Sequence, residues 1–350
     1  MVDIIALGCG LVGKFVITKL SEQGKHVFVV DIDVPDTIKH NSNISYTEGD
    51  VFEVLPELPD TNLVLNLLPG AIGEKVRAEL VASGKHVIDL AFTEVEPSTH
   101  HELAITTGSK LVWDVGIAPG LSNMILRQEF ARDNNILDVT IKVGGNPSQP
   151  DSQWSYMAPF SPSDVIEEYT RPARIIVDGE VKIVEAISDR HIINVANYGQ
   201  MEAFLTDGLR SLIKSGFSPN MREYTVRWPG HIGKWLEEKD TLTESELLDA
   251  WGFDENREEF TWMEIKLVYN DYEVVWEVLD TGKDGDSSMA RTTGLVTIAC
   301  VIELLEDLSN DTDLFNSGVY APENLPLESI DRVIEYLKSQ DVTIIREIIK

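Results

Sequence analysis

The chain of 350 residues is 43% hydrophobic and 25% charged, which is ordinary for a folded globular protein and long enough for about two domains. Its 29 basic and 59 acidic residues give a net charge of −30. This balance argues against nucleic acid or an anionic membrane surface as a partner, because no basic excess is available to neutralise phosphates. Two explanations of the charge stay open: a solvated acidic surface, and long-range attraction of a cationic substrate.

The stretch from Met1 to Asp33 has the pattern of a dinucleotide-binding unit. An apolar run ends at Leu7, the glycine turn GCGLVG occupies residues 8–13, a helical pattern follows, and a second apolar run ends at Asp31. In such a unit the glycines allow a tight turn and a close approach to a pyrophosphate, and the helix N-terminus offers N–H groups to it. Together with the later strand ends, this predicts as cofactor-binding residues Gly8, Gly10, Leu11, Val12, Gly13, Asp31, Ile32, Asp50, Leu68, Pro69, Asp89 and Ala91.

Asp31 favours NAD over NADP as the cofactor. It lies 18 residues past Gly13 and would accept hydrogen bonds from the adenosine ribose, while repelling a 2′-phosphate. Asp33 adds to this bias, and Lys39 is the nearest cation after it.

Alternating strands and helices continue from residue 62 and predict a Rossmann domain over residues 1–120. Strands are expected at 62–68, 85–90 and 110–115, with helices at 72–83 and 97–107. This alternation indicates a doubly wound parallel sheet, in which ligands bind at the carboxyl ends of the strands.

Residues 121–289 predict a second α/β domain with a mostly antiparallel sheet. Strands are expected at 138–145, 174–181, 190–195 and 225–228, and a hairpin turns at Asn270–Asp271 between strands at 262–269 and 273–278. A helical insert near 236–256 begins with a capping box formed by Thr243 and Glu246. We expect residues 290–350 to form C-terminal helices that return to the Rossmann domain, with one apolar strand in the tail.

Five ordered motifs in addition to the glycine turn resemble signatures of the saccharopine dehydrogenase-like family. They are DVGIAPGLSN at 114–123, KVGGNP at 142–147, EAFLTDGLR at 202–210, VRWPGH at 226–231 and ARTTG at 290–294. The family includes saccharopine reductases, lysine 6-dehydrogenases and carboxynorspermidine dehydrogenases. The resemblance implies NAD(P)-linked chemistry at a carbon–nitrogen bond of an amino-acid-like substrate in lysine or polyamine metabolism. It also implies a Rossmann domain joined to a dimerising domain.

Candidate catalytic residues are Asp89, Glu94 and His231. Asp89 ends a strand and is expected to face the ligand edge, with Glu94 close behind; paired carboxylates suit an amine or imine because they stabilise the cation and shuttle its proton. The alternative is that Asp89 caps a helix and Glu94 is solvated. His231 opens a helix, and its ordinary pKa would let it act near neutrality, although a structural role is the alternative.

Candidate substrate-binding residues are Arg227, Arg291, Asn123 and Thr292. Arg227 ends a strand before Pro229-Gly230, and Arg291 precedes a helix start where an arginine can fork onto a carboxylate. Two further groups are expected to be structural: a helical stretch that carries Glu202, Asp207 and Arg210, with the last two a surface pair, and a set of aromatic residues that shape pocket or core, Trp154, Tyr156, Tyr169 and Trp228.

Three alternative functions can be considered for these residues. The first is an NAD-linked dehydrogenase of amino-acid C–N bonds, the second is a nucleotide sensor whose second domain only dimerises, and the third is an aldehyde dehydrogenase of the glyceraldehyde-phosphate type. The third needs an activated cysteine, and Cys300 in an apolar run is a poor candidate. The two cysteines, Cys9 and Cys300, indicate neither a disulfide framework nor a metal site.

We also expect a homodimer and a cytoplasmic location. The strands 262–278 alternate apolar residues, and an open sheet face needs cover, which a symmetric partner supplies most often. The first apolar run starts almost at once and no uncharged stretch of about 18 apolar residues occurs, so neither a signal peptide nor a membrane span is expected.

Overall fold

The computed structural model describes residues 2–310 and 315–350 and divides into two compact units. The first contains residues 1–124 and 293–337, and the second contains residues 125–292 and 338–350. Three helices, α6 (Leu121–Arg132), α10 (Ser288–Asn310) and α11 (Leu327–Ser339), contain the boundaries at which the chain passes from one unit to the other.

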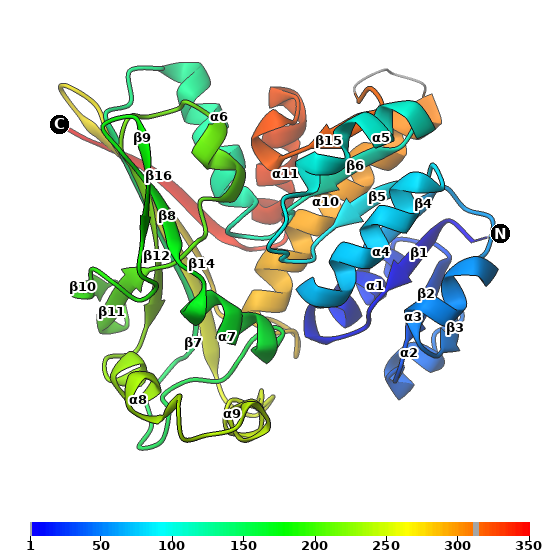
Figure 1. Cartoon of the computed structure of the whole chain (residues 1–350), viewed down its shortest axis with the longest axis horizontal. Coiled ribbons are helices and arrows are strands. Elements are labelled where there is room, and N and C mark those ends of the chain that lie inside the picture. The colour runs from blue at the N-terminus through cyan, green and yellow to red at the C-terminus, as the bar shows by residue number, and fades with distance from the viewer. Residues whose placement is uncertain (1, 311–314) are drawn as a thin grey trace. The chain divides into compact units, whose positions relative to one another are not determined.

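The first unit is built on a seven-stranded parallel sheet with the order β15-β6-β5-β4-β1-β2-β3. Six of these strands have the order that is typical of a Rossmann fold, which confirms the predicted doubly wound sheet (Figure 1). The strands are β1 (Ile4–Leu7), β2 (Val27–Asp31), β3 (Ile44–Glu48), β4 (Leu63–Asn66), β5 (His86–Asp89), β6 (Lys110–Trp113) and β15 (Gly318–Tyr320).

Helices lie between these strands in the chain. They pack on the sheet through apolar residues that recur along one side. In α4 (Gly70–Ala82), Val76 and Leu80 pack in one buried cluster with Ile5 and Leu7 of β1. The other helical segments of this unit are α1 (Leu11–Glu22), α2 (Asp36–Lys39), α3 (Val51–Val54), η1 (Leu55–Glu57), η2 (Pro97–His100), α5 (His101–Thr107), η4 (Pro322–Asn324) and α11 (Leu327–Ser339), the last of which ends in the second unit.

The long helix α10 packs closely against α1 of the first unit at Gly294. A Cβ at this position of α10 would lie 2.5 Å from Phe15 Cδ1 of α1, so only glycine allows the two helices to approach this closely. The helix is long and apolar enough to cross a membrane, but 83% of its apolar window is buried inside the protein, as expected for a core helix.

The second unit is built on a nine-stranded sheet with the order β10-β11-β12-β7-β13-β14-β16, from which β8 and β9 branch at β12. Its pairings are antiparallel except that β12 and β7 are parallel, which confirms the predicted mostly antiparallel sheet. The strands are β7 (Asp138–Pro147), β8 (Ala173–Val177), β9 (Glu180–Val184), β10 (His191–Val195), β11 (Gly199–Leu205), β12 (Met221–Arg227), β13 (Glu259–Val268), β14 (Glu273–Asp280) and β16 (Thr343–Ile349).

The helical segments of the second unit are short. The predicted capping box is confirmed at the start of α9 (Glu244–Ala250), where Thr243 and Glu246 bond reciprocally, and the hairpin between β13 and β14 turns at Asn270–Asp271 as predicted. The remaining segments are α7 (Pro162–Thr170), η3 (Arg210–Lys214) and α8 (His231–Glu238).

Three local predictions are wrong. The expected single strand over 174–181 is a hairpin, because Asp178 and Gly179 both take positive φ, the conformation of a tight type I′ turn. The expected helix through Glu202 and Asp207 is strand β11 followed by a loop, and Asp207 pairs with Arg174 of β8 instead of Arg210. The tail strand β16 pairs with β14 and therefore belongs to the second sheet, not to the Rossmann domain.

The sheet face on which the dimer prediction rested is not an open apolar face. The apolar residues of the alternation, such as Ile265 and Trp276, lie on a buried face, where Trp276 Nε1 donates to Glu129 of α6. The opposite face carries cross-strand ion pairs, including Lys142–Glu264 at 2.8 Å. This sheet therefore does not support the predicted homodimer.

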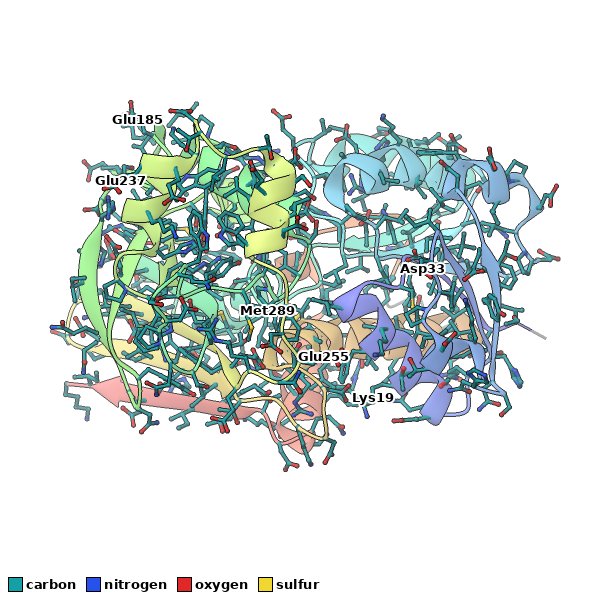
Figure 2. The ribbon with its side chains drawn as sticks, turned by 90° about the horizontal axis from the view of Figure 1, so that it is seen from below. Lys19, Asp33, Glu185, Glu237, Glu255 and Met289 are labelled. Carbon is teal, nitrogen blue, oxygen red and sulfur yellow. The ribbon has the colours of Figure 1, made fainter. Side chains whose placement is uncertain are left out.

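Part of the acidic excess lies on exposed positions in both units. Asp33, Glu185, Glu237 and Glu255 are all exposed (Figure 2). Their exposure is compatible with the solvated-surface explanation of the net charge.

Candidate functional site

The glycine turn between β1 and α1 has the geometry of a dinucleotide cradle. Gly8 has φ +100°, and a Cβ there would lie 2.7 Å from the carbonyl oxygen of Leu67; a Cβ on Gly13 would lie 2.7 Å from the carbonyl oxygen of Gly8. Gly10 is the N-cap of α1, and a Cβ on it would have open space around it. The first N–H groups of α1, at Leu11 and Val12, have no carbonyl within their own helix to bond, so this end is suited to a phosphate.

Asp31 is held beside this turn. Its Oδ2 accepts a hydrogen bond from Cys9 N at 2.5 Å, and its Oδ1 accepts one from Asp33 N at 3.1 Å. Each carboxylate oxygen can accept a second hydrogen bond, so the carboxylate has capacity left for a ribose hydroxyl. Burial raises the pKa of the Cys9 thiol to about 12, with the Asp31 charge as a further cause, so this thiol is no candidate nucleophile.

The other predicted cofactor residues divide between accessible and buried positions. Leu11 and Ile32 are exposed, as is Pro69, which follows β4 together with the half-buried Leu68. Asp50 accepts a hydrogen bond from Phe52 N and caps α3. Ala91 is buried.

The prediction that Asp89 faces a ligand is wrong. Its side chain is 0% exposed and forms a buried ion pair with Arg77 Nε of α4. It also accepts hydrogen bonds from Asn66 Nδ2 at 3.1 Å and Ala91 N at 2.9 Å. The carboxylate is therefore neutralised and largely satisfied inside the first unit. Arg77, an arginine on the apolar side of the predicted helix, was the sequence signal for this pair.

Glu94 does not pair with Asp89. It lies exposed in the loop after β5, so the two carboxylates do not form the expected constellation. Asn123 is also placed structurally: it is fully buried, its Oδ1 accepts from Gly120 N at 3.1 Å, and its Nδ2 donates to Glu323 at 2.9 Å.

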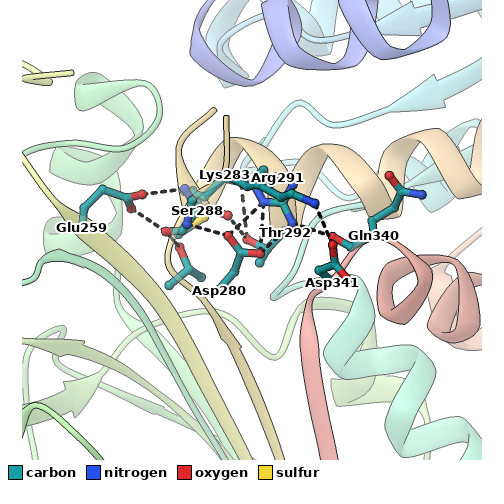
Figure 3. A network of polar contacts seen from close by, with 11 residues as sticks. Glu259, Asp280, Lys283, Ser288, Arg291, Thr292, Gln340 and Asp341 are labelled. Atoms are coloured by element: carbon teal, nitrogen blue, oxygen red, sulfur yellow. Dashed lines mark hydrogen bonds and ion pairs between the residues drawn. The ribbon is translucent and has the colours of Figure 1, made fainter. Parts of the chain in front are cut away.

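Arg291 does fork onto a carboxylate, but the carboxylate belongs to Asp280 at the end of β14 (Figure 3). Its Nη2 also donates to the carbonyl oxygen of Gln340 at 2.7 Å. Thr292, which is fully buried, donates its hydroxyl to Ser288 O at 2.8 Å within its own helix. Both predicted substrate contacts are thus occupied by the protein itself.

Arg227 lies in an aromatic enclosure in the second unit. Its Nε donates to Tyr169 Oη at 2.8 Å, its Nη1 donates to the carbonyl oxygen of Val226, and its guanidinium lies 4.7 Å from the centre of the Tyr156 ring. Its Nη2 is 3.6 Å from Glu168 Oε2, an ion pair that is too long for a hydrogen bond. Burial by itself would lower the pKa of Arg227, but the interactions with Tyr169 and Tyr156, and then with Glu168, raise it above its usual value, so Arg227 is a permanent cation.

His231 belongs to the same enclosure but is not poised as a neutral-pH acid or base. Burial, reinforced by the Arg227 charge, lowers its pKa to about 3. Its Nε2 accepts a hydrogen bond from the Tyr169 hydroxyl at 3.1 Å, and its Nδ1 donates to Trp154 O at 3.0 Å, a tautomer assigned from these partners. Neutral His231 therefore orients Tyr169, which in turn contacts Arg227.

The aromatic residues around His231 form one buried cluster, as predicted for Trp154, Tyr156 and Tyr169. Trp251 joins them, and its Nε1 together with the Tyr156 hydroxyl has no hydrogen-bond partner among the described residues. Trp228 lies instead in the neighbouring cluster with Tyr224 and Val226.

The chain is similar in sequence and in fold to known proteins. The profile of the saccharopine dehydrogenase C-terminal domain matches residues 116–342, well over half of the chain. The chain belongs to the saccharopine dehydrogenase family. Its fold is similar over the full length of both chains to the apo saccharopine dehydrogenase (L-Glu forming) from Saccharomyces cerevisiae, with a TM-score of 0.77 and 14% identity.

A curated relative is similar over a shorter region. Alpha-aminoadipic semialdehyde synthase from Arabidopsis thaliana is 22% identical over 168 residues, which cover 45% of this chain and 16% of that protein. The matched region is therefore a small part of a much longer relative. The family is one of oxidoreductases.

Two residues of the Arg227 enclosure were missed from the sequence: Glu168 on α7 and Glu223 on β12. The available signal was the alternation of Glu223, Thr225 and Arg227, which puts three polar residues on one face of a strand. Such a face is either solvated or closed by partners from another element, and here Glu168 supplies the partner. Within residues 2–310 and 315–350, no group of three or more His, Cys, Asp or Glu side chains is arranged to hold a metal ion.

Proposed function

We propose that this protein is an NAD-linked dehydrogenase that acts on the C–N bond of an amino-acid substrate, of the saccharopine reductase or lysine 6-dehydrogenase type. Family membership supports an oxidoreductase, and the glycine turn with Asp31 supports the dinucleotide. The nicotinamide would supply the hydride donor or acceptor. The chain's own residues would bind and orient the substrate and hold the proton that its nitrogen exchanges.

Arg227 carries the substrate assignment. It is a buried, permanent cation whose Nε and Nη1 are fixed by Tyr169 and Val226, while its Nη2 makes a long contact to Glu168. A substrate carboxylate could replace or join that contact, because guanidinium recognises carboxylates through short charge-assisted hydrogen bonds. Arg291 cannot serve in the same way while it is forked onto Asp280.

Reduction of NAD⁺ in the presence of a panel of amino acids that includes lysine and saccharopine tests the proposal. The reverse reaction, measured as NADH oxidation with lysine semialdehyde and glutamate, distinguishes the two types. We expect turnover in one of these assays and weaker turnover with NADP. The absence of turnover with every amino or imino acid would remove the enzymatic function.

A nucleotide sensor remains the second candidate, and one observation favours it. Of the charged or polar residues that suggested catalysis, Asp89, Asn123 and Arg291 are paired within the protein. Binding of NAD without turnover, in a protein whose Arg227→Ala variant binds NAD equally well, would be the sensor's signature. A carboxynorspermidine dehydrogenase-type activity is the alternative enzyme, and adding its polyamine substrate to the panel tests it.

We further propose that the protein is a homodimer with a small amino-acid-like substrate as its partner molecule. Three exposed apolar side chains at the margins of the second sheet support this proposal: Ile183, Ile192 and Ile348. Light scattering coupled to size exclusion gives the mass directly; a monomer at micromolar concentration would refute the proposal.

A further inference from the structure

A chain of polar contacts leads away from Arg227 into the interior of the second unit. Glu223, Thr225 and Arg227 alternate along β12 and share a face. Thr206, just past the end of β11, lies beside them because β11 pairs with β12. Glu168 of α7 reaches the same face.

The contacts between these residues are continuous. The Thr206 hydroxyl contacts Glu223 Oε2 at 2.9 Å, the Thr206 and Thr225 hydroxyl oxygens are 2.9 Å apart, and the Thr225 hydroxyl contacts Glu168 Oε1. Glu168 then faces Arg227. Three oxygen–oxygen contacts thus join two carboxyl groups through two hydroxyl groups.

The two threonine hydroxyls cannot supply a proton to all three contacts. Each threonine hydroxyl has one proton to donate, so two protons are available for three contacts. With both glutamates ionised, one pair of oxygens would face each other without a proton, inside a buried site where unmade hydrogen bonds are costly. One proton on either carboxyl group gives every contact a donor.

We infer that Glu223, Thr206, Thr225 and Glu168 form a proton relay that holds one extra proton, which rests on Glu223 and can be passed to Glu168 beside Arg227. In the resting arrangement Glu223 donates to Thr206, Thr206 to Thr225, and Thr225 to the Glu168 carboxylate. For transfer, the O–H bonds of Glu223, Thr206 and Thr225 break as O–H bonds form on Thr206, Thr225 and Glu168. No residue is oxidised or reduced, and the net charge of the relay stays the same.

The surroundings decide where the proton rests. Glu223 is buried, and the charged groups that act on it, Glu168 on α7 and Asp207 after β11, are both acidic. Asp207 is itself paired with Arg174 of β8. Burial first, and then these charges, raise the pKa of Glu223 to about 8. Glu168, whose side chain is 17% exposed, has the Arg227 cation beside it.

The role of the relay rests on the proposed function. Glu168 would supply or accept the proton that accompanies C–N chemistry of a substrate held by Arg227, and Glu223 would be the internal store. This assigns an acid–base position to a site from which Asp89 and His231 have been removed, since the first is sealed against Arg77 and the second is neutral and hydrogen-bonded on both nitrogens.

Infrared spectroscopy tests the relay without reference to activity. Wild-type protein at pH 7 should show the C=O band of a buried, protonated carboxylic acid that disappears as the pH passes about 8. The band should be absent from Glu223→Gln and unchanged in Glu167→Gln, a control that alters the adjacent glutamate on α7, which pairs with Arg171. Absence of the band in wild type, or its persistence in Glu223→Gln, would overturn the inference. Circular dichroism shows whether each variant is folded; if Glu223→Gln is not, a shift in the frequency of the band in folded Thr206→Val, which removes the hydrogen-bond partner of the acid, decides the question in its place, and an unshifted band would overturn the inference.

The pH profile of kcat/KM tests the transfer step. In wild type a limb should appear near pH 8, and it should be lost or moved by at least one pH unit in Glu223→Gln and in Thr225→Val, which interrupts the relay. Thr170→Val, at an exposed threonine on α7 that bonds only its own helix, is the matched control. An unshifted limb in both relay variants would overturn the transfer step. If no substrate turns over at all, the proposed function fails, while the infrared result still decides whether the shared proton exists.

Discussion

Two arginine–carboxylate pairs, one in each unit, differ in how completely they are enclosed. Arg77 and Asp89 are both 0% exposed, and the second oxygen of Asp89 accepts two further hydrogen bonds. Arg227 and Glu168 are separated by 3.6 Å, and the side chain of Glu168 is 17% exposed. Burial closes the first pair to a ligand, whereas the second has a cation whose outer nitrogen is only loosely engaged. The position of a charged residue at a strand end is thus weaker evidence of function than the number of its partners.

The largest effect should follow from breaking the enclosed pair. Arg77→Met leaves the Asp89 carboxylate buried without its counter-ion, and removal of one partner of a buried pair typically costs about 3–5 kcal/mol. Urea unfolding should report this loss, and Arg77→Met with Asp89→Leu should recover part of it. Lys75→Met, on an exposed position of the same helix, is the control. A loss below about 1 kcal/mol would mean that the pair is not closed as described.

Breaking the open pair should affect activity more than stability. Arg227→Ala is expected to lower kcat/KM at least about 100-fold, equivalent to roughly 2.7 kcal/mol of transition-state binding, through loss of the substrate carboxylate contact. The affinity for NAD should not change. Arg174→Ala, which removes the partner of Asp207 in the same unit, controls for general disturbance. Equal losses in both variants would place Arg227 in a structural role.

The assignment of the dinucleotide site can be tested at Asp31. Asp31→Ala should weaken NAD binding by about 1–3 kcal/mol, the usual loss for a charge-assisted hydrogen bond, and should narrow the preference over NADP. Asp33→Ala, at an exposed acid two residues away, should have a smaller effect. Isothermal titration with both dinucleotides measures each quantity. Tighter binding of NADP than NAD by the wild type would contradict the assignment of Asp31.

The most gradual effect should come from Glu223, which should make the free energy of unfolding depend on pH. Because its folded pKa is raised to about 8 while an unfolded glutamate titrates near 4.3, the folded protein binds the extra proton between these values. Stability should therefore fall as the pH rises through this window, by on the order of 1.4 kcal/mol per pH unit at most. Glu223→Gln should flatten this slope in urea unfolding between pH 5 and about 8. A variant with the wild-type slope would show that Glu223 is ionised throughout.

Much of the first unit could be predicted because its signals are local. The glycine turn, the helix after it and the acid at the end of β2 lie within 31 residues, and the contacts of Gly13 and Asp31 follow from one β–α–β connection, although Gly8 lies against Leu67 after β4. The same local reasoning found the capping box of α9 and the Asn270–Asp271 hairpin.

Local reasoning failed where the partner of a residue lies on another element. Arg77 is 12 residues from Asp89, Asp280 is 11 residues from Arg291, and Glu323 is 200 residues from Asn123. It also failed at Asp178-Gly179, where the turn signal was present but the apolar residues on both sides suggested one continuous strand.

The sequence by itself determined the family, the parallel order of the first sheet, the mostly antiparallel second sheet and the residues of the glycine turn, because each depends on neighbouring residues and on backbone geometry. Only the tertiary structure decided which polar side chains remain available for a ligand. A charge in a folded protein is neutralised, buried or left open by groups that other elements bring to it. Asp89 and Arg291 are satisfied in this way, while Arg227 gains Glu168, Tyr169 and the shared proton of Glu223.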